Sequence, residues 1–181
     1  MAIRKILTEE DEQLRKHSRK VDKFDARLHT LIDDMRETLE SSGGVGLAAP
    51  QVGVLRRVVV LLDVNQEPEE LLELVNPEVI ETSGEERMLE GCLSVPGVWG
   101  YVMRPEHAVI RAQDRDGNWF EREGEGIVAQ CFCHETEHLD GHLFTEKVEE
   151  YVDIEQLHAE QAAQDEQETQ AASRETEAPA E

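Results

Sequence analysis

Two histidines and a glutamate form the pattern most able to do chemistry, in the segment His134-Glu135-Thr136-Glu137-His138. Residues four apart on a helix share one face, with Cβ atoms about 5–6 Å apart. Both imidazoles could therefore bind one cation, and Glu135 beside them could take up and return a proton. A solvent-exposed helix is the alternative for so short a pattern, but the spacing favours a catalytic metal site.

A catalytic divalent cation usually has three protein ligands and keeps one position for water. The third ligand could be a cysteine. Cys131 lies three residues before His134 on the same helical face, and Cys92 lies in a glycine-flanked, hydrophobic loop expected at residues 90–97. Helical geometry alone does not choose between them. We do not expect His142 to be a ligand, because it follows Gly141, where the helix should end. One other cysteine is expected in the core and four other histidines at the surface: Cys133, His17, His29, His107 and His158.

Three segments, in their order along the chain, resemble the signature of the peptide deformylase family. They are GVGLAAPQ at residues 44–51, EGCLS at 90–94 and HETEHLDG at 134–141. The first alone is a glycine loop without the Lys-Ser/Thr ending of a phosphate loop, and the second alone could be a turn with an inert cysteine. The resemblance covers residues 6–146. It implies a hydrolase of protein biosynthesis that removes the formyl group from the N-terminal methionine of nascent polypeptides and releases formate.

The resemblance also implies the ligand set. Cys92, His134 and His138 would bind the cation, which leaves Cys131 without that role. The family usually binds Fe²⁺ in the cell, and Zn²⁺, Ni²⁺ or Co²⁺ can take the same ligands. We therefore expect one divalent metal ion per chain, Fe²⁺ in the cell.

A cation of this kind lowers the pKa of a water in its open position towards neutrality. We expect Glu135 to take the proton from that water and to give it to the leaving amine. An oxyanion that forms on the formyl group needs donors already in place. The resemblance supplies two of them, the side-chain amide of Gln51 and the backbone N–H of Leu93.

Methionine specificity requires a narrow apolar pocket beside the metal. Ile127 and Cys131 lie seven and three residues before the first histidine of the pattern, on the same helical face, and Val45 resembles a family pocket position. Gly46 and Gly91 lack a Cβ, so the substrate backbone could approach them closely. The alternative is that these residues belong to the core.

Two positions depart from the family pattern, and one pair matches it. Glu137 replaces an Asp, and if that carboxylate orients a ligating histidine, its extra methylene would loosen the geometry. Cys133 replaces a residue that is often Gln, which puts a supporting contact in doubt. Glu90 and Arg104 resemble a buried ion pair that braces the cysteine segment, with a surface role for Arg104 as the alternative.

The helices and strands that must position these residues are predicted from the spacing of apolar residues and from the glycines that end helices. Helices are expected over residues 24–39, with Asp25 as N-cap and Gly43 at the end, over 127–139, between Gly126 and Gly141, and over 152–163. Strands are expected over 57–63, 74–82, 108–113 and 119–121, with a hairpin turn at 114–118. Residues 44–53 are too rich in glycine for a helix. The sequence therefore predicts an α+β fold, with mixed or antiparallel sheets packed around a central metal-binding helix.

Composition indicates where and with what the chain works. The net charge is −23, and residues 149–181 hold 11 acidic residues and one basic residue. Such a chain is a poor general binder of phosphate backbones or anionic membranes. We expect no direct nucleic-acid binding, no membrane association, and only transient proximity to the ribosome, weak or through another surface than the acidic end.

The same observations give the domain organisation. We expect a catalytic domain at residues 1–150, a C-terminal helix at 151–163, and an acidic disordered tail at 164–181, since no aromatic residue follows Tyr151. Three cysteines and no secretory signal indicate a cytoplasmic protein without a disulfide framework. We expect a monomer whose substrates are N-formylmethionyl nascent peptides.

Two other readings of the sequence remain. A zinc peptidase also uses a His-Glu-x-x-His helix, but its third ligand usually follows that helix, whereas the intact segment around Cys92 favours a deformylase. The second is a metal-binding or interaction protein without activity. Retention of both Glu135 and Gln51 argues against it, because a purely structural site requires neither.

Overall fold

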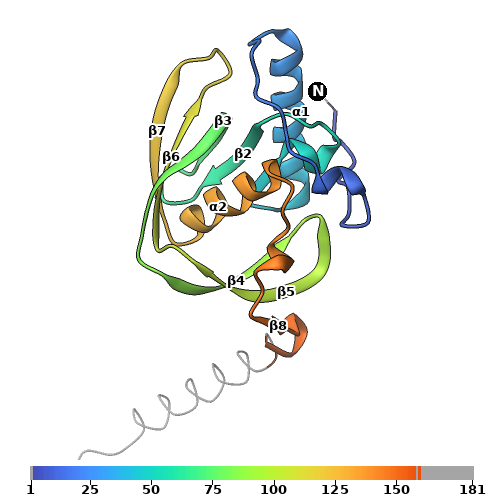
Figure 1. The fold of residues 1–181 in the computed structure, drawn as a ribbon, viewed down its shortest axis with the longest axis vertical. Helices are drawn as coiled ribbons and strands as arrows, with labels where there is room; N and C mark the ends of the chain where they lie inside the picture. The colour runs from blue at the N-terminus through green and yellow to red at the C-terminus, as the bar shows by residue number, and fades with distance from the viewer. Residues whose placement is uncertain (1, 158, 160–181) are drawn as a thin grey trace, which may run out of the picture.

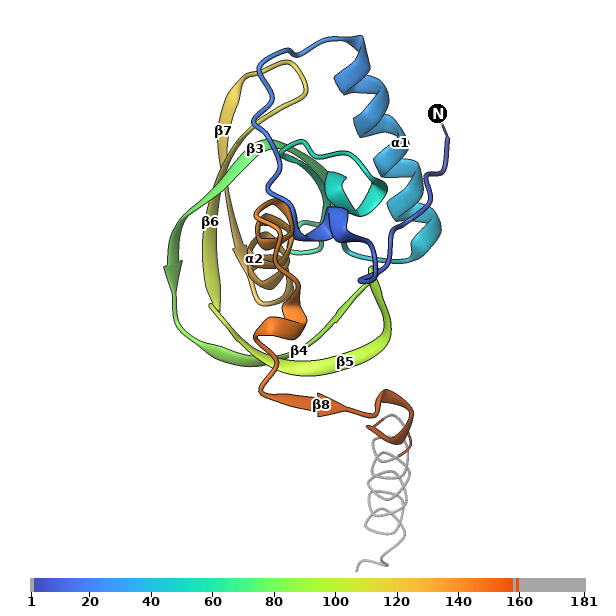
Figure 2. The same cartoon turned by 45° about the vertical axis from the view of Figure 1, so that its right-hand side comes forward.

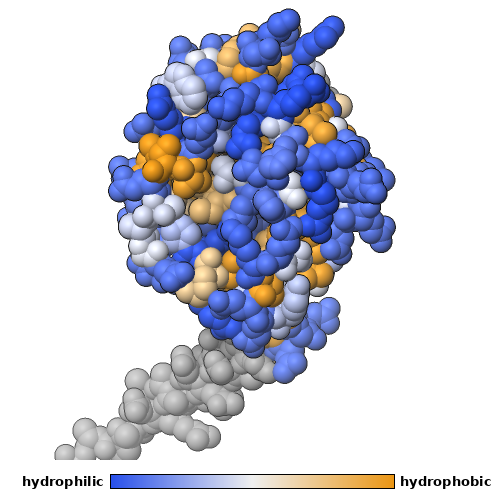
Figure 3. Space-filling view, viewed as in Figure 1, coloured by the Kyte–Doolittle hydropathy of each residue, from blue (hydrophilic) through white to orange (hydrophobic). Residues whose placement is uncertain are grey.

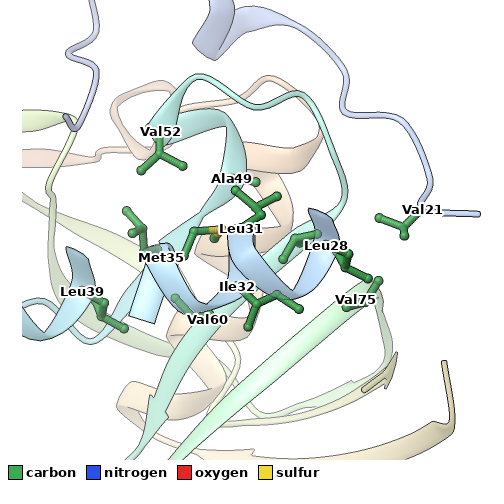
Figure 4. Packing of buried hydrophobic residues seen from close by; sticks show 12 residues of the cluster. Val21, Leu28, Leu31, Ile32, Met35, Leu39, Ala49, Val52, Val60 and Val75 are labelled. Atoms are coloured by element: carbon green, nitrogen blue, oxygen red, sulfur yellow. The ribbon is translucent and has the colours of Figure 1, made fainter. Parts of the chain in front are cut away.

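Asp25 and Gly43 delimit the first helix, as the sequence predicts. In the computed structural model, which describes residues 2–157 and 159, helix α1 (Ala26–Ser42) begins after Asp25, whose carboxylate accepts hydrogen bonds from the N–H groups of Arg27 and Leu28. It ends at Gly43, whose φ of 68° is the left-handed conformation that glycine adopts without strain. One face of α1 packs into a buried apolar cluster (Figure 4), which includes Leu28, Leu31, Ile32, Met35 and Leu39.

An antiparallel sheet of five strands separates α1 from the second helix. Its order is β1-β2-β3-β6-β7, with β1 (Gly46–Ala48), β2 (Val58–Asp63), β3 (Glu70–Ser83), β6 (His107–Gln113) and β7 (Trp119–Glu125). Along β2, Val58 and Val60 join the α1 cluster, whereas Val59 and Leu61 join a second cluster around α2 (Ile127–Leu139). Helices on both faces explain why the sequence of β2 is a continuous apolar run, as predicted.

A second antiparallel sheet brings the cysteine segment to the site. It has the order β4-β5-β8, with β4 (Glu86–Cys92), β5 (Val95–Arg104) and β8 (Glu150–Val152). The prediction of a loop at residues 90–97 is therefore wrong: these residues form the end of a hairpin, and only Leu93 and Ser94 connect its strands. The helix expected from residue 152 also needs correction, because Val152 pairs with Trp99 in β8 and helical residues begin at 154. The predicted tail at 164–181 lies outside the described residues.

Helix α2 runs through the middle of the molecule, and the two sheets curve around it (Figures 1 and 2). Its bounds are those predicted, and Gly141 just beyond it has φ of 84°. A Cβ there would lie 2.7 Å from the backbone carbonyl of Arg15, so the N-terminal segment passes directly beside this turn. Phe132 and Leu139 are fully buried and fix the helix against the larger sheet.

Three short 3-10 helices complete the described chain: η1 (Glu12–Arg15), η2 (Ala49–Val52) and η3 (Phe144–Glu146). Residues 44–53, which were expected to avoid helix, thus form the short strand β1 followed by η2. Among the helices of the described residues, none is long and apolar enough to cross a membrane.

Candidate metal centre

The ligand atoms predicted from the sequence converge at one point. Nε2 of His138 lies 3.2 Å from Sγ of Cys92 and 3.1 Å from Nε2 of His134. All three atoms lie within 4.8 Å of one another, and both imidazoles are buried. Helix α2 supplies the histidines one turn apart, and the end of strand β4 supplies the sulfur.

This donor set fits a divalent cation. Tetrahedral coordination with usual bond lengths would separate two nitrogens by about 3.4 Å and a nitrogen from a sulfur by about 3.6 Å. The two separations that involve His138 Nε2, 3.1 and 3.2 Å, are slightly shorter, so small shifts there would accommodate an ion. Burial and the neighbouring His134 lower the pKa of His138, which leaves a neutral imidazole that can present a lone pair.

Glu90 holds His134 in the orientation that the site requires. Its carboxylate lies 2.5 Å from Nδ1 of His134, so the other ring nitrogen, Nε2, faces Cys92 and His138. Burial opposes the charge on Glu90, but hydrogen bonds from Arg104, at 2.7 and 2.8 Å, and from His134 lower its pKa to about 2. Glu90 and Arg104 are both buried, so the expected ion pair is confirmed. A surface role for Arg104 is excluded.

Glu137 supports Arg104 and not a histidine. Its oxygens lie 2.7 and 3.1 Å from the Arg104 guanidinium, and Lys147 contacts it at 2.5 Å. The longer side chain that replaces Asp therefore reaches a basic residue, and our concern about a loosened histidine does not apply here. Cys133 is half-buried and not a core residue, and burial raises the pKa of its thiol.

Glu135 is a buried carboxylate with one oxygen, Oε2, that has no hydrogen-bond partner among the described residues. Burial raises its pKa to about 7, against the opposing effect of His134. A Cβ on Gly46 would lie 2.5 Å from its other oxygen. Gly46 is thus needed to accommodate the glutamate, in addition to any role in substrate approach.

Gln51 is fixed so that its amide NH₂ points towards the metal ligands. Its Oε1 accepts a hydrogen bond from the backbone N–H of Ala48 at 2.8 Å, which leaves Nε2 to donate to Ser94 Oγ at 3.2 Å and to Cys92 Sγ at 3.7 Å. Ser94 is fully buried, and its backbone N–H also reaches the sulfur, at 3.4 Å. Leu93 lies between Cys92 and Ser94 in the chain, at the tip of the β4–β5 hairpin.

A cavity of about 470 Å³ opens beside the donor atoms. All the other predicted site residues line it together with His134 and Cys92: Gln51, Leu93, Glu135, Val45, Gly46, Gly91, Ile127 and Cys131. His138 is buried and is not among the residues that line the cavity. Burial raises the pKa of the Cys131 thiol, so this residue presents a neutral apolar surface. Ile127 is 42% exposed and is therefore not a core residue.

Sequence reasoning missed several residues of the site. Trp99 lines the cavity and packs where a Cβ on Gly91 would lie, 2.9 Å from its ring. Gln130 donates to Glu90 at 3.0 Å, and its place four residues before His134 could have revealed it. Ser94 could have been found because it belongs to the EGCLS motif.

The remaining histidines do not join the site. His142 is exposed and pairs with Glu146 at 2.8 Å, which confirms that it does not continue the histidine ladder. His17 is exposed as predicted, whereas His29 and His107 are half-buried. His158 lies outside the described residues.

Known proteins resemble this chain in both sequence and structure. A family model described as "Polypeptide deformylase" matches residues 3–153. The chain is similar to the peptide deformylase of Caldicellulosiruptor bescii, with 54% identity over 87% of this chain and 92% of the relative, and to that of Acetivibrio thermocellus, with 52% identity over 87% and 90%. The crystal structure of a peptide deformylase from Legionella pneumophila superimposes with a TM-score of 0.77 and 42% identity, over 94% of this chain and 98% of that one.

Proposed function

The chain belongs to the polypeptide deformylase family, and from that premise we propose that Cys92, His134 and His138 bind a catalytic divalent cation with Glu135 as the proton carrier. The enzyme is a hydrolase that removes the N-formyl group from nascent polypeptides. The convergence of one sulfur and two imidazole nitrogens, beside a cavity that contains an unpartnered carboxylate oxygen, is the observation that carries the residue assignment.

A divalent cation, when bound, activates water for attack on an amide carbonyl. The chain's own contribution is a donor set that is already assembled. Glu90 fixes the ring of His134, and Ser94 N–H and Gln51 direct their hydrogens towards Cys92. These contacts fix the sulfur beside the two imidazoles, and a cysteine binds metals through its deprotonated sulfur.

Glu135 moves the proton. Its carboxylate lines the cavity, and the absence of a partner for Oε2 within the described chain leaves that oxygen available to a water molecule. It accepts the proton that the attacking water loses and delivers it to the nitrogen of the breaking amide bond. The C–N bond then breaks, and the products are formate and a free α-amine.

Two donors stabilise the negative charge that develops on the formyl oxygen. The Gln51 amide cannot turn away from the cavity, because its oxygen is held by Ala48 N–H. Leu93 contributes its backbone N–H from the tip of the β4–β5 hairpin. Donors positioned before the reaction lower the barrier without reorganisation, and removal of one such donor typically slows turnover about 10²–10³-fold.

The apolar part of the cavity accepts the methionine side chain. Ile127 and Cys131 lie one helical turn apart on α2, and Val45 and Trp99 line the same cavity. Its volume of about 470 Å³ leaves room for the first peptide unit as well as the side chain. Fe²⁺ is the ion that we propose for the cell, because a thiolate together with imidazoles suits such borderline metals. We also propose that the enzyme is a cytoplasmic monomer.

An anaerobic assay of formate release from formyl-Met-Ala-Ser, with metal analysis of the same sample, tests the assignment. We expect one equivalent of metal per chain and turnover that stops when a chelator removes it. Cleavage of internal peptide bonds instead of formate release would indicate a peptidase and overturn the proposal.

Replacement of Glu135 by Ala separates chemistry from metal binding. The variant should keep its metal, because Glu135 is not a ligand, but should lose turnover by several orders of magnitude. Replacement of Cys92 by Ala is the complementary control, since it should remove both metal and turnover. Unchanged turnover in the Glu135 variant would disprove the proton-carrier role.

A further inference from the structure

The segment that links η1 to α1 is basic in an acidic chain. Residues 15–23 hold five of the 18 Lys and Arg residues and one of the 41 acidic residues, a net charge of +4 in a chain of net charge −23. Its five basic side chains are exposed. We use the name basic strip for these five residues together with the neighbouring Arg56: Arg15, Lys16, Arg19, Lys20, Lys23 and Arg56.

Two arginines of the strip are held side by side by the backbone. Arg19 and Arg56 form a parallel β-bridge, in which Arg19 N–H donates to Leu55 O at 3.2 Å and Arg57 N–H donates to Arg19 O at 3.0 Å. Residues opposite each other in a bridge project on the same side, and like charges in that arrangement repel. The fold therefore directs two arginine side chains to the same side of the strip, where their charges would repel less with an anion between them.

The nearby carboxylates do not supply that anion. Three of them are already partnered with basic residues: Glu146 with Arg15, Glu78 with Lys20 at 3.3 Å, and Asp140 with Arg57 at 2.5 Å. Lys23 interacts electrostatically with Asp25. Within residues 2–157 and 159, three side chains of the strip have no carboxylate partner: Lys16, Arg19 and Arg56. The only acidic residue inside the segment is Asp22. The strip thus keeps an excess of unpaired positive charge.

The net charge of the whole chain does not cancel this local excess. The Debye length is about 10 Å at 0.1 M ionic strength, so more distant acidic groups are largely screened. Our expectation that the chain does not bind nucleic acid was drawn from the net charge, which does not register how the basic residues are distributed. The structure gathers them along one extended segment.

We propose that the basic strip binds the phosphate backbone of RNA. Guanidinium groups bind phosphate oxygens through paired hydrogen bonds, and two adjacent ones suit neighbouring phosphates. A lipid surface is disfavoured, because the only apolar residue of the segment, Val21, is buried and cannot insert. The enzyme acts on nascent polypeptides, and these are still attached to a ribosome, whose surface is largely RNA. The strip would therefore bring the enzyme to its substrate.

Fluorescence anisotropy with a labelled RNA duplex of about 16 base pairs tests the proposal on the full chain. We expect affinity that falls steeply between about 50 and 200 mM salt, as for any phosphate-backbone contact. The double variant Arg19→Gln, Arg56→Gln should bind at least about tenfold more weakly and lower the salt slope by about two. Its formate release from a short peptide should be unchanged, since neither residue lines the cavity.

A matched control removes the same charge elsewhere. Lys5 and Arg87 lie outside the strip, on the N-terminal segment and on β4, and the double variant Lys5→Gln, Arg87→Gln should bind RNA like the unchanged enzyme. Equal losses in both double variants would attribute binding to net charge and overturn the proposal. So would undetectable RNA binding at the lowest salt, or tighter binding to anionic vesicles than to RNA. None of these results bears on the deformylase activity, which formate release measures independently.

Discussion

Gly46 shows how the site constrains a single residue. The space that its Cβ would occupy is filled by the Glu135 carboxylate, 2.5 Å away, whereas a Cβ on Gly44 would meet the end of the Leu93 side chain, at 2.9 Å. Both contacts are with side chains, but only Glu135 carries the proton in our proposal. Substitutions at these two glycines can therefore distinguish a loss of activity from a general effect of crowding.

Replacement of Gly46 by Ala should displace Glu135 and lower kcat by at least about tenfold, with little change in the free energy of unfolding. The Gly44→Ala variant is the control, because its Cβ would meet the end of the Leu93 side chain and not the Glu135 carboxylate. Formate-release kinetics and urea unfolding of both variants provide the measurement. Equal kcat values in the two variants would contradict the role of Gly46.

Replacement of Glu90 by Gln should weaken the metal site. The change removes the charge that Arg104 and His134 share and leaves a buried guanidinium partly unpaired. Loss of such an orienting partner typically lowers metal affinity about 10–100-fold. Competition with a chromophoric chelator measures this affinity, and Gln130→Ala, which removes only a neutral donor to Glu90, should have a smaller effect.

At this scale the sequence predicted which residues meet, but not how they are supported. The motifs identified the three donor atoms, Glu135 and Gln51. The contact between Glu90 and His134 spans 44 positions of the chain, and the contact of Glu137 with Arg104 spans 33. No local periodicity encodes contacts of that kind, because they depend on how the hairpin packs against α2.

Helix α2 divides its residues between two environments. Phe132 is fully buried against the larger sheet, whereas Ile127 is 42% exposed and lines the cavity. Phe132→Ala should cost about 3–5 kcal/mol of stability. Ile127→Ala should change stability by less than about 1 kcal/mol but raise KM for formyl-methionyl peptides. Urea unfolding and steady-state kinetics of both variants test this division, and a raised KM with no loss of stability in the Phe132 variant would contradict it.

A partly buried ion-pair cluster that connects β3 with α1 and the 114–118 turn should make the free energy of unfolding depend on pH. Glu73 of β3 binds Arg115, at 2.6 and 2.7 Å, and Arg36 of α1, at 2.8 Å. Burial raises the pKa of Glu73, but these hydrogen bonds outweigh it and the pKa lies below the usual 4.5. A lowered folded-state pKa stabilises the fold above the unfolded value, and this stability is lost as pH falls through the folded value.

Glu73→Gln should therefore destabilise the protein by about 1–2 kcal/mol at neutral pH, with a difference that shrinks below about pH 4.5. Urea unfolding at both pH values checks the sign. Glu121→Gln, on the exposed face of β7, provides a control that should show no such trend. If the difference in unfolding free energy between Glu73→Gln and the unchanged protein stayed constant across this pH range, ionisation of Glu73 would not be the source of the pH dependence.

Periodicity and breakers predicted the elements that bury one regular face. Helices α1 and α2 and strands β2, β6 and β7 lie close to where the sequence placed them. The β4–β5 hairpin was missed, because Gly91, Pro96, Gly97 and Gly100 resemble a loop, and their strand conformation is imposed by pairing. The predicted C-terminal helix begins too early for a related reason: pairing with β5 makes residues 150–152 extended, and no local pattern indicates that pairing.

For the whole molecule, removal of the metal should lower stability. A ligand that binds only the folded state stabilises it by about 2.7 kcal/mol at a free concentration of 100 Kd, which corresponds to a Tm change of about 5–10 °C for a chain of this size. Thermal melts with and without a chelator measure the change. The Cys92→Ala variant should melt at the same temperature in both conditions, and a chelator effect of equal size there would place the stabilising ion elsewhere.

The sulfur ligand sits at the tip of a hairpin that also carries Leu93 and Ser94, and the hairpin touches Gln51 through that tip. With Cys92 bound as we propose, the bond between its sulfur and the cation also connects the metal site to the two donors of the formyl oxygen, Gln51 and Leu93. Oxidation of that thiolate to a sulfenic acid would undo both at once, and its reversal by a cellular thiol would restore both. Sensitivity of the enzyme to oxidants would then depend on whether this one sulfur stays bound to the cation.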